Sequence, residues 1–198
     1  MSKIRYPRRP LPVTRWALTA ARPAVVLCLA VVLCTGAAVA GNAPDFKLKD
    51  LDGNWFRLKD HVGEVVYVNF WATWCVPCRR EMPHIQSLWN EFGDQGLVVV
   101  GVNTDSAQNK SKIKPYVKRQ RVDYLTVLDP DNNVLDAYNP TRDLPYAVLI
   151  DQTGNIRKTY QGYRTGDEEL LKQDIVELLG ADTGGTPSAG ESEESAGD

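Results

Sequence analysis

Cysteine and histidine are scarce in this chain of 198 residues, and basic residues do not outnumber acidic ones. Four cysteines are too few for a fold held together by disulfides. The two histidines, His61 and His84, have no spacing that suits a zinc site of about four ligands, so we expect no metal. Hydrophobic residues make up 43% of the chain and charged residues 24%, values that exclude global disorder and a fibrous fold.

The first forty residues lack acidic side chains altogether, although they contain six basic ones. Subtracting these six from the 23 basic residues leaves 17 for the rest of the chain, against all 25 acidic residues, a net charge of −8. Nucleic-acid binding depends on cations that meet phosphates. We therefore expect no nucleic-acid partner.

The basic start is followed by an apolar run over residues 24–33 and by the small residues Ala38-Val39-Ala40. This order is typical of a signal peptide, whose cleavage after Ala40 would leave Gly41 as the N-terminus. The alternative is an uncleaved membrane anchor, because the 17 residues of 24–40 are at the lower limit of what spans a bilayer. Both interpretations predict that the remainder is exported into an oxidising compartment.

The remainder is expected to form one domain over residues 43–180, followed by a tail at 181–198. The tail has five acidic residues and no basic one, and we expect it to be disordered. Apolar and β-branched runs predict strands at 46–48, 55–58, 64–71, 97–102, 124–128, 147–150 and 156–160, the first two of them paired as a hairpin.

Helical spacing predicts three helices between these strands and one after the last strand. They are expected at 76–92, with a kink at Pro83, at 107–120, at 132–138, and in a last helix that ends at Gly180. Thr165 and Glu168 predict a capping box at the start of that last helix. Alternating strands and helices that end in a hairpin favour an α/β sandwich around a mixed sheet.

Cys75 and Cys78 are the only cysteines of the exported part, and they lie where a predicted strand meets a helix. The helix N-terminus stabilises a thiolate, the reactive form of cysteine. Cys78 follows three residues later, within one helical turn, so the pair can close and open a disulfide. We predict that Cys75, the more exposed of the two, attacks a substrate and that Cys78 resolves the mixed disulfide.

Residues 69–83 (NFWATWCVPCRREMP) resemble the active-site segment of thioredoxin-like proteins. More narrowly, the chain resembles the exported TlpA/ResA-like thiol-disulfide oxidoreductases, whose domain is of the AhpC/TSA-redoxin type. The resemblance covers residues 43–179 and includes Pro83, which stands where thioredoxins have a helix-kinking proline. It implies a thioredoxin-like three-layer sandwich with a mixed central sheet, an N-terminal β-hairpin and a central strand-helix insert, here within residues 107–138.

The resemblance also implies a substrate site. Leu144-Pro145 matches the cis-proline turn that lies beside the active site of thioredoxins, just before an apolar strand. Trp74, Pro77, Leu144 and Pro145 are accordingly expected to bind the substrate. A substrate segment could pair with the free main chain of Leu144 as an added strand.

Two of the positions that depart from the family pattern bear on proton transfer. Asn69 stands where thioredoxin has a buried aspartate, and an amide cannot act as a general base. TlpA/ResA-like proteins often have a buried glutamate near the start of the insert, where this chain has Asp105. Asp105 is therefore a candidate proton shuttle, and the alternative is an aspartate that caps a loop or a helix.

The leading functional hypothesis is a thiol-disulfide oxidoreductase outside the cytoplasm, acting as a reductant of protein disulfides, for example in cytochrome c maturation. The resemblance implies a membrane electron donor or thiol reductase as a second partner. We expect a monomer without a cofactor. Two alternatives share the fold: a thiol peroxidase, although Ala72 and Val68 stand where a peroxidase needs Thr or Ser and Pro, and a non-enzymatic copper chaperone, although the last histidine is His84.

Overall fold

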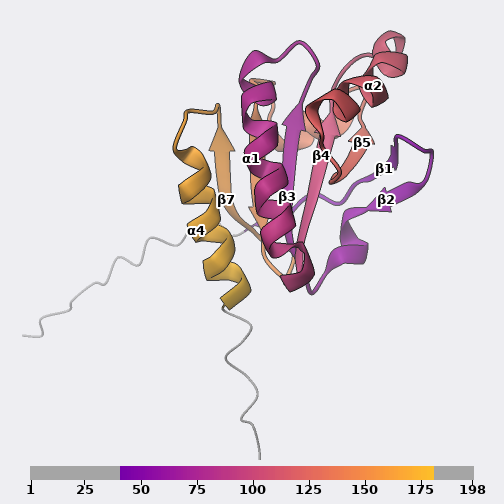
Figure 1. The fold of residues 1–198 in the computed structure, drawn as a ribbon. Coiled ribbons are helices and arrows are strands. Elements are labelled where there is room, and N and C mark those ends of the chain that lie inside the picture. The colour runs from indigo at the N-terminus through magenta and orange to yellow at the C-terminus, as the bar shows by residue number, and fades with distance from the viewer. Residues whose placement is uncertain (1–40, 181–198) are drawn as a thin grey trace, which may run out of the picture. The chain divides into compact units, whose positions relative to one another are not determined.

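The structure is a computed structural model that describes residues 41–180 (Figure 1). The predicted signal peptide or anchor at residues 1–40 and the predicted tail at 181–198 lie outside the described residues. Within 41–180, no helix is both long enough and apolar enough to cross a membrane.

Seven strands and four α-helices make up the described domain. The strands are β1 (Lys47–Asp50), β2 (Trp55–Arg57), β3 (Val65–Trp71), β4 (Leu97–Asn103), β5 (Leu125–Leu128), β6 (Tyr146–Ile150) and β7 (Ile156–Gln161). The α-helices are α1 (Val76–Phe92), α2 (Lys110–Gln120), α3 (Asn133–Tyr138) and α4 (Asp167–Gly180). Three short 3-10 turns, η1 (Leu58–His61), η2 (Gly93–Gln95) and η3 (Ala107–Asn109), join them.

The strands form one mixed sheet in the order β2-β1-β5-β4-β3-β6-β7. β3 and β5 run parallel to β4, and the remaining neighbours are antiparallel. β5 and the helices beside it are the expected central insert, and β5 joins the N-terminal hairpin to the rest of the sheet. The sheet is therefore continuous from the hairpin to β7.

Side-chain alternation along β3 explains why both faces of the sheet are covered. All seven residues of β3 are buried. Val65, Tyr67 and Trp71 belong to a core shared with α1, α2 and α4, whereas Val66, Val68 and Phe70 belong to a core that includes α3 and the hairpin. The three layers predicted from the sequence are confirmed.

The last helix begins differently from the prediction. Thr165 forms no capping hydrogen bond among the described residues, and α4 begins at Asp167. The Asp167 carboxylate accepts from the Arg164 N–H at 2.7 Å, and Glu168 accepts from the Gly166 N–H at 2.9 Å. Gly166 has a φ of 104°, which only glycine adopts readily. The acidic side chains of the first turn therefore accept from N–H groups of the residues that precede α4, and the Thr165 hydroxyl does not cap the helix.

Candidate active site

The two cysteines form a disulfide at the start of α1, with an S–S distance of 2.03 Å. β3 ends at Trp71, and a tight turn follows in which the Cys75 N–H donates to the Ala72 carbonyl at 3.1 Å. Cys75 is the N-cap residue of α1, and its Sγ accepts from the Cys78 N–H at 3.2 Å. The strand-turn-helix order thus places one sulfur directly against a free N–H group of the helix terminus.

The disulfide is buried but has an exposed apolar edge. Cys75 is 4% exposed and Cys78 is 1% exposed, so the predicted order of exposure is confirmed by a small margin. Trp74 is 68% exposed and Val76 53%, on either side of Cys75. Pro77 follows in the first turn of α1 and is half-buried. Two exposed apolar side chains therefore flank the buried Cys75 in the sequence.

The turn before β6 lies at the same end of the sheet. The Leu144–Pro145 peptide bond is cis, as the sequence predicts. In the antiparallel register, Tyr146 lies opposite Phe70, close to where β3 ends and the turn to Cys75 begins. Among the described residues, the N–H and carbonyl groups of Leu144 have no hydrogen-bond partner. These groups are free to pair with another chain, although substrate binding by Leu144 and Pro145 stays a prediction.

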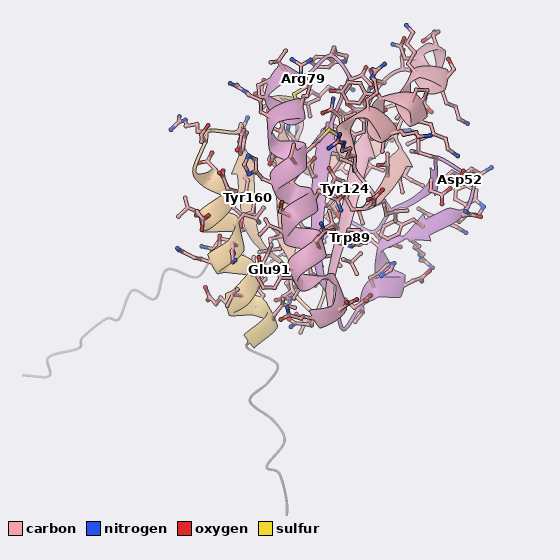
Figure 2. The ribbon with its side chains drawn as sticks, viewed as in Figure 1. Asp52, Arg79, Trp89, Glu91, Tyr124 and Tyr160 are labelled. Carbon is pink, nitrogen blue, oxygen red and sulfur yellow. A yellow bond between two sulfur atoms is a disulfide. The ribbon has the colours of Figure 1, made fainter. Side chains whose placement is uncertain are left out.

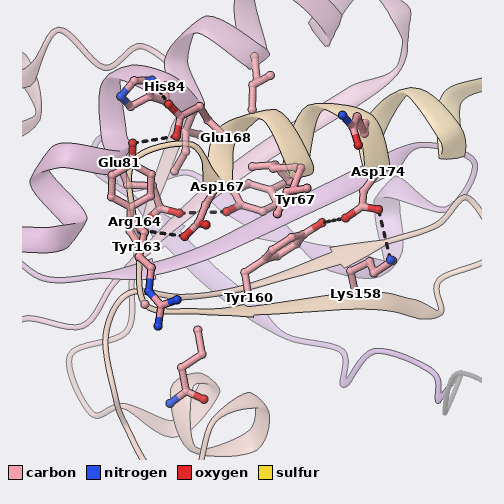
Figure 3. Close-up of a pocket in the computed structure, with 17 residues that line it drawn as sticks. Tyr67, Glu81, His84, Lys158, Tyr160, Tyr163, Arg164, Asp167, Glu168 and Asp174 are labelled. Carbon is pink, nitrogen blue, oxygen red and sulfur yellow. Dashed lines mark hydrogen bonds and ion pairs between the residues drawn. The ribbon is translucent and has the colours of Figure 1, made fainter.

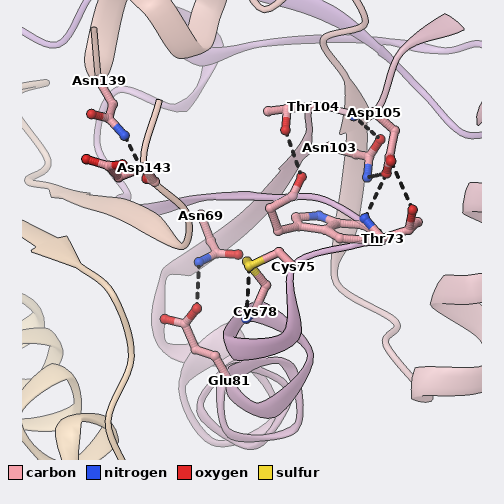
Figure 4. The surroundings of a disulfide bond; sticks show 11 residues. Asn69, Thr73, Cys75, Cys78, Glu81, Asn103, Thr104, Asp105, Asn139 and Asp143 are labelled. Carbon is pink, nitrogen blue, oxygen red and sulfur yellow. Dashed lines mark hydrogen bonds between the residues drawn. A yellow bond between two sulfur atoms is a disulfide. The ribbon is translucent and has the colours of Figure 1, made fainter. Parts of the chain in front are cut away.

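Asp105 anchors the turn that precedes Cys75. Its carboxylate is 3% exposed and accepts from the Thr73 N–H at 2.8 Å, from the Thr73 hydroxyl at 2.9 Å and from the Asn103 side-chain amide at 2.8 Å (Figure 4). The sequence leaves open whether Asp105 shuttles protons or caps a loop. Its contacts are those of a loop anchor, because the polar groups that it binds belong to the turn and to β4.

Glu81 is a candidate functional residue that the sequence reasoning missed. It lies one turn beyond Cys78 on α1 and is only 7% exposed. Its carboxylate accepts from the Asn69 side-chain amide at 3.1 Å and from the Tyr67 hydroxyl at 3.3 Å. Figure 4 shows the Asn69 side chain next to the Glu81 carboxylate, with Cys75 and Cys78 close by.

Burial changes the acid strength of Glu81. The loss of water around the carboxylate raises its pKa from 4.5 to about 7, and the hydrogen bonds from Asn69 and Tyr67 only partly oppose this shift. A carboxyl group with that pKa can both accept and return a proton near neutral pH. Asn69 cannot accept a proton, but it holds a group that can. Glu81 on α1 is therefore a candidate for the acid-base function that Asn69 on β3 cannot perform.

One signal in the sequence could have identified Glu81. Counting in helical steps from Cys78 gives Glu81, Ile85 and Leu88, so that Glu81 falls on the inward face of α1. A carboxylate in an otherwise apolar stripe is rarely buried without a partner. The partners, however, come from β3, and the sequence alone does not show that Asn69 and Tyr67 face this helix.

A cavity of about 510 Å³ connects Glu81 with the surface between α1, β7 and α4 (Figure 3). Tyr67 and Glu81 form part of its wall, with His84 one turn further along α1 and Tyr163 and Glu168 opposite. The Tyr163 hydroxyl donates to Glu168 at 3.0 Å. Tyr160, which also lines this cavity, is labelled in Figure 2. Glu81 therefore borders a cavity on one side, although most of its side chain is buried.

Comparison with known proteins agrees with this geometry. The AhpC/TSA family model matches residues 39–165 of the chain. The chain belongs to the AhpC/TSA family. Thiol-disulfide oxidoreductase ResA of Geobacillus thermodenitrificans is 37% identical over 144 residues, which cover 73% of this chain and 80% of that protein. ResA of Bacillus subtilis is 37% identical over 138 residues, which cover 70% and 74%.

Solved structures give the same result for the fold. A Chlorobium tepidum protein assigned as thiol:disulfide interchange protein DsbE matches with a TM-score of 0.66 and 31% identity, over 71% of this chain and 96% of that one. The domain is thus a thioredoxin-like fold of the AhpC/TSA family, and the chain is a thiol-disulfide oxidoreductase. Within residues 41–180, no three His, Cys, Asp or Glu side chains are grouped as a metal site requires.

Proposed function

We propose that the chain reduces disulfides of exported proteins, with Cys75 as the attacking thiol and Cys78 as the resolving thiol. The observation that carries this proposal is the position of the disulfide. Cys75 caps α1, and its sulfur receives the Cys78 N–H, an arrangement that favours the thiolate of Cys75. The exposed side chains of Trp74 and Val76 provide an apolar surface for a polypeptide beside it.

The exchange proceeds in two steps. The Cys75 thiolate attacks one sulfur of the substrate disulfide, the substrate S–S bond breaks, and the first substrate thiolate leaves. The Cys78 thiolate then attacks the Cys75 sulfur, and the second substrate thiolate leaves. Two electrons pass to the substrate, whose thiolates take up two protons, and Cys75–Cys78 becomes the disulfide.

Glu81 supplies the base for the second step. The Cys78 thiol must lose a proton before it can attack. Water has little access to this thiol, because Cys78 is buried. The ionised Glu81 carboxylate accepts that proton from one turn away on the same helix. The cavity between α1, β7 and α4 then lets the proton pass to solvent.

The compartment and the partners are part of the same proposal. The basic and apolar segments of residues 1–40, which end in Ala38-Val39-Ala40, favour delivery outside the cytoplasm. An oxidising compartment requires a dedicated source of electrons, and a membrane thiol reductase would supply them. Apocytochrome c is one substrate class that needs reduced cysteines, before haem attachment. We propose that the domain acts as a monomer.

Trapping of a mixed disulfide tests the proposal. Cys78→Ser should accumulate a covalent adduct between Cys75 and a substrate protein, identified by mass spectrometry after non-reducing electrophoresis. Cys75→Ser is the matched control and should yield no adduct. Adducts that form through Cys78 in the Cys75→Ser variant, and not through Cys75, would reverse the assignment of the two thiols.

Two assays separate this function from the alternatives. A thiol peroxidase would consume hydrogen peroxide at a rate that depends on Cys75, and a copper chaperone would retain Cu(I) after reduction and dialysis. We expect neither result, and we expect the reduced protein to transfer electrons to a protein disulfide.

A further inference from the structure

A second cavity lies between α2 and the β1–β2 hairpin. Its volume is about 420 Å³, within the range of small-ligand sites. The sheet contributes Lys47, Lys49, Trp55 and Leu128, and the segment from η3 into α2 contributes Ala107, Lys110 and Ile113. An ion pair between Lys114 and Asp52 joins α2 to the hairpin turn, and Figure 1 shows the two side by side.

The cavity has an apolar interior. Leu48, Ala107, Ile113, Leu128 and Pro130 line it, and none of them offers a side-chain hydrogen bond. A small hydrophilic ion would make no favourable contact with these apolar walls. An occupant therefore needs an apolar body.

The rim of the cavity carries positive charge without matching negative charge. Lys47, Lys49 and Lys110 have no ion-pair partner among residues 41–180. The ammonium groups of Lys47 and Lys49 lie 4.9 Å and 5.0 Å from the centre of the Trp55 ring, which is 61% exposed. The one carboxylate in the wall, Asp105, already accepts hydrogen bonds from the active-site turn through both oxygens. An anionic head group fits this rim.

We propose that this cavity binds a single-chain amphiphile with an anionic head, such as a fatty acid or the chain of an anionic lipid. The apolar chain enters between the hairpin and α2, the head group meets the three lysines, and the Trp55 ring covers the chain. This site is separate from the disulfide chemistry and nothing in that chemistry requires it. Its inner wall nevertheless includes Asp105, which also holds the turn before Cys75.

Calorimetric titration of the chain that begins at Gly41 with sodium decanoate, below the concentration at which it forms micelles, tests the proposal. Decanoate should bind saturably, and it should quench or shift the fluorescence of Trp55 but not that of a Trp55→Phe variant. Decanol, which has the same chain without the charge, should bind about tenfold more weakly. Equal binding of decanol and decanoate would contradict a role for the lysines.

Two kinds of variant locate the site. Lys110→Gln should weaken decanoate binding about threefold to fivefold, whereas Lys118→Gln, which removes the same charge from the same helix outside this cavity, should leave it unchanged. Ala107→Phe should abolish binding by filling the space from an exposed position. Equal losses in Lys110→Gln and Lys118→Gln, or normal binding in Ala107→Phe, would show that the helix attracts anions without a cavity site.

Vesicles distinguish the two sources of the amphiphile. The chain that begins at Gly41, without the basic and apolar segments that would bind a membrane by themselves, is sedimented with phosphatidylcholine vesicles that contain phosphatidylglycerol. If the occupant is a membrane lipid, Ala107→Phe loses both decanoate and vesicle binding relative to the unchanged chain. If it is a free fatty acid, Ala107→Phe loses decanoate binding alone. Either result supports the site, provided that decanoate binding is lost.

Discussion

At the scale of single residues, burial raises the pKa of Glu81 to about 7, which suits this carboxyl group to proton transfer. Replacing Glu81 by Gln keeps the size of the side chain and one oxygen that can accept from Asn69, but it removes the proton acceptor. We expect Glu81→Gln to slow disulfide exchange about hundredfold at pH 8 and to remove the rise in rate that the unchanged protein shows near pH 7. Stopped-flow measurement of exchange across pH 5 to about 9 would check this.

The control for that experiment is Glu91→Gln. Glu91 lies on the same helix, is exposed and pairs with Lys172, so that its loss should leave both the rate and the pH profile unchanged. If Glu81→Gln retains the inflection near pH 7, the proton acceptor is another group.

The raised pKa of Glu81 also predicts how stability depends on pH. The folded protein, with a pKa of about 7 for Glu81, holds this proton more tightly than the unfolded chain, where the pKa is near 4.5. Its contribution is fully present below about pH 4.5 and is lost as the pH rises through about 7. The free energy of unfolding should fall by up to about 3 kcal/mol over that window in the unchanged protein relative to Glu81→Gln. Urea denaturation at several pH values would measure the difference, and parallel curves would contradict it.

At the scale of elements, β4 approaches two aromatic rings through Gly101. A Cβ atom at this position would lie 3.0 Å from Trp71 Nε1 and 3.1 Å from Tyr124 Cε2, both in buried rings that cannot move aside easily. Gly101→Ala should therefore destabilise the domain by about 1–3 kcal/mol. Gly93→Ala is the matched control, because its Cβ would lie 3.4 Å from Trp89, and it should change stability by less than about 0.5 kcal/mol. Thermal unfolding of both variants would compare them.

The free main chain of Leu144 predicts strand pairing with the substrate. A disulfide-containing peptide with an N-methyl group beside its cysteine cannot donate that N–H, and we expect it to react about fivefold more slowly. The same methyl group placed at the far end of the peptide should have no effect. Equal rates for both peptides would indicate that recognition depends on side chains.

The elements themselves could be predicted from the sequence, because each follows a local pattern. The apolar run of β3, the helical stripe of α1 and the closing hairpin of β6 and β7 contain their own signals, and the structure confirms them. The start of α4 could not be predicted in this way. The positive φ of Gly166 sets the direction of the chain just before the helix, and no local pattern shows that angle. Glu81 could not either, because its partners Asn69 and Tyr67 come from another element and only the packed fold brings them together.

At the scale of the whole molecule, the charge distribution divides the chain into a basic leader and an acidic body. We expect residues 1–40, fused to a reporter that is active only outside the cytoplasm, to deliver it there. N-terminal sequencing of the exported chain should then give Gly41 if the leader is cleaved, and the full-length chain should stay in the membrane fraction if it is an anchor. A leader without its apolar residues 24–33 is the control. Full-length protein in the cytosol would contradict both forms of the prediction.

The complete burial of β3 affects how fast its backbone amide protons exchange with solvent. Strands that are paired on both sides and covered on both faces release their amide protons to exchange with solvent only when the whole domain opens. The turn at residues 72–74 and the first turn of α1 lie beyond the end of that strand. We expect local opening to loosen the cysteine pair while the strand beneath it stays closed, so that the amide protons of β3 exchange more slowly than those of residues 72–78.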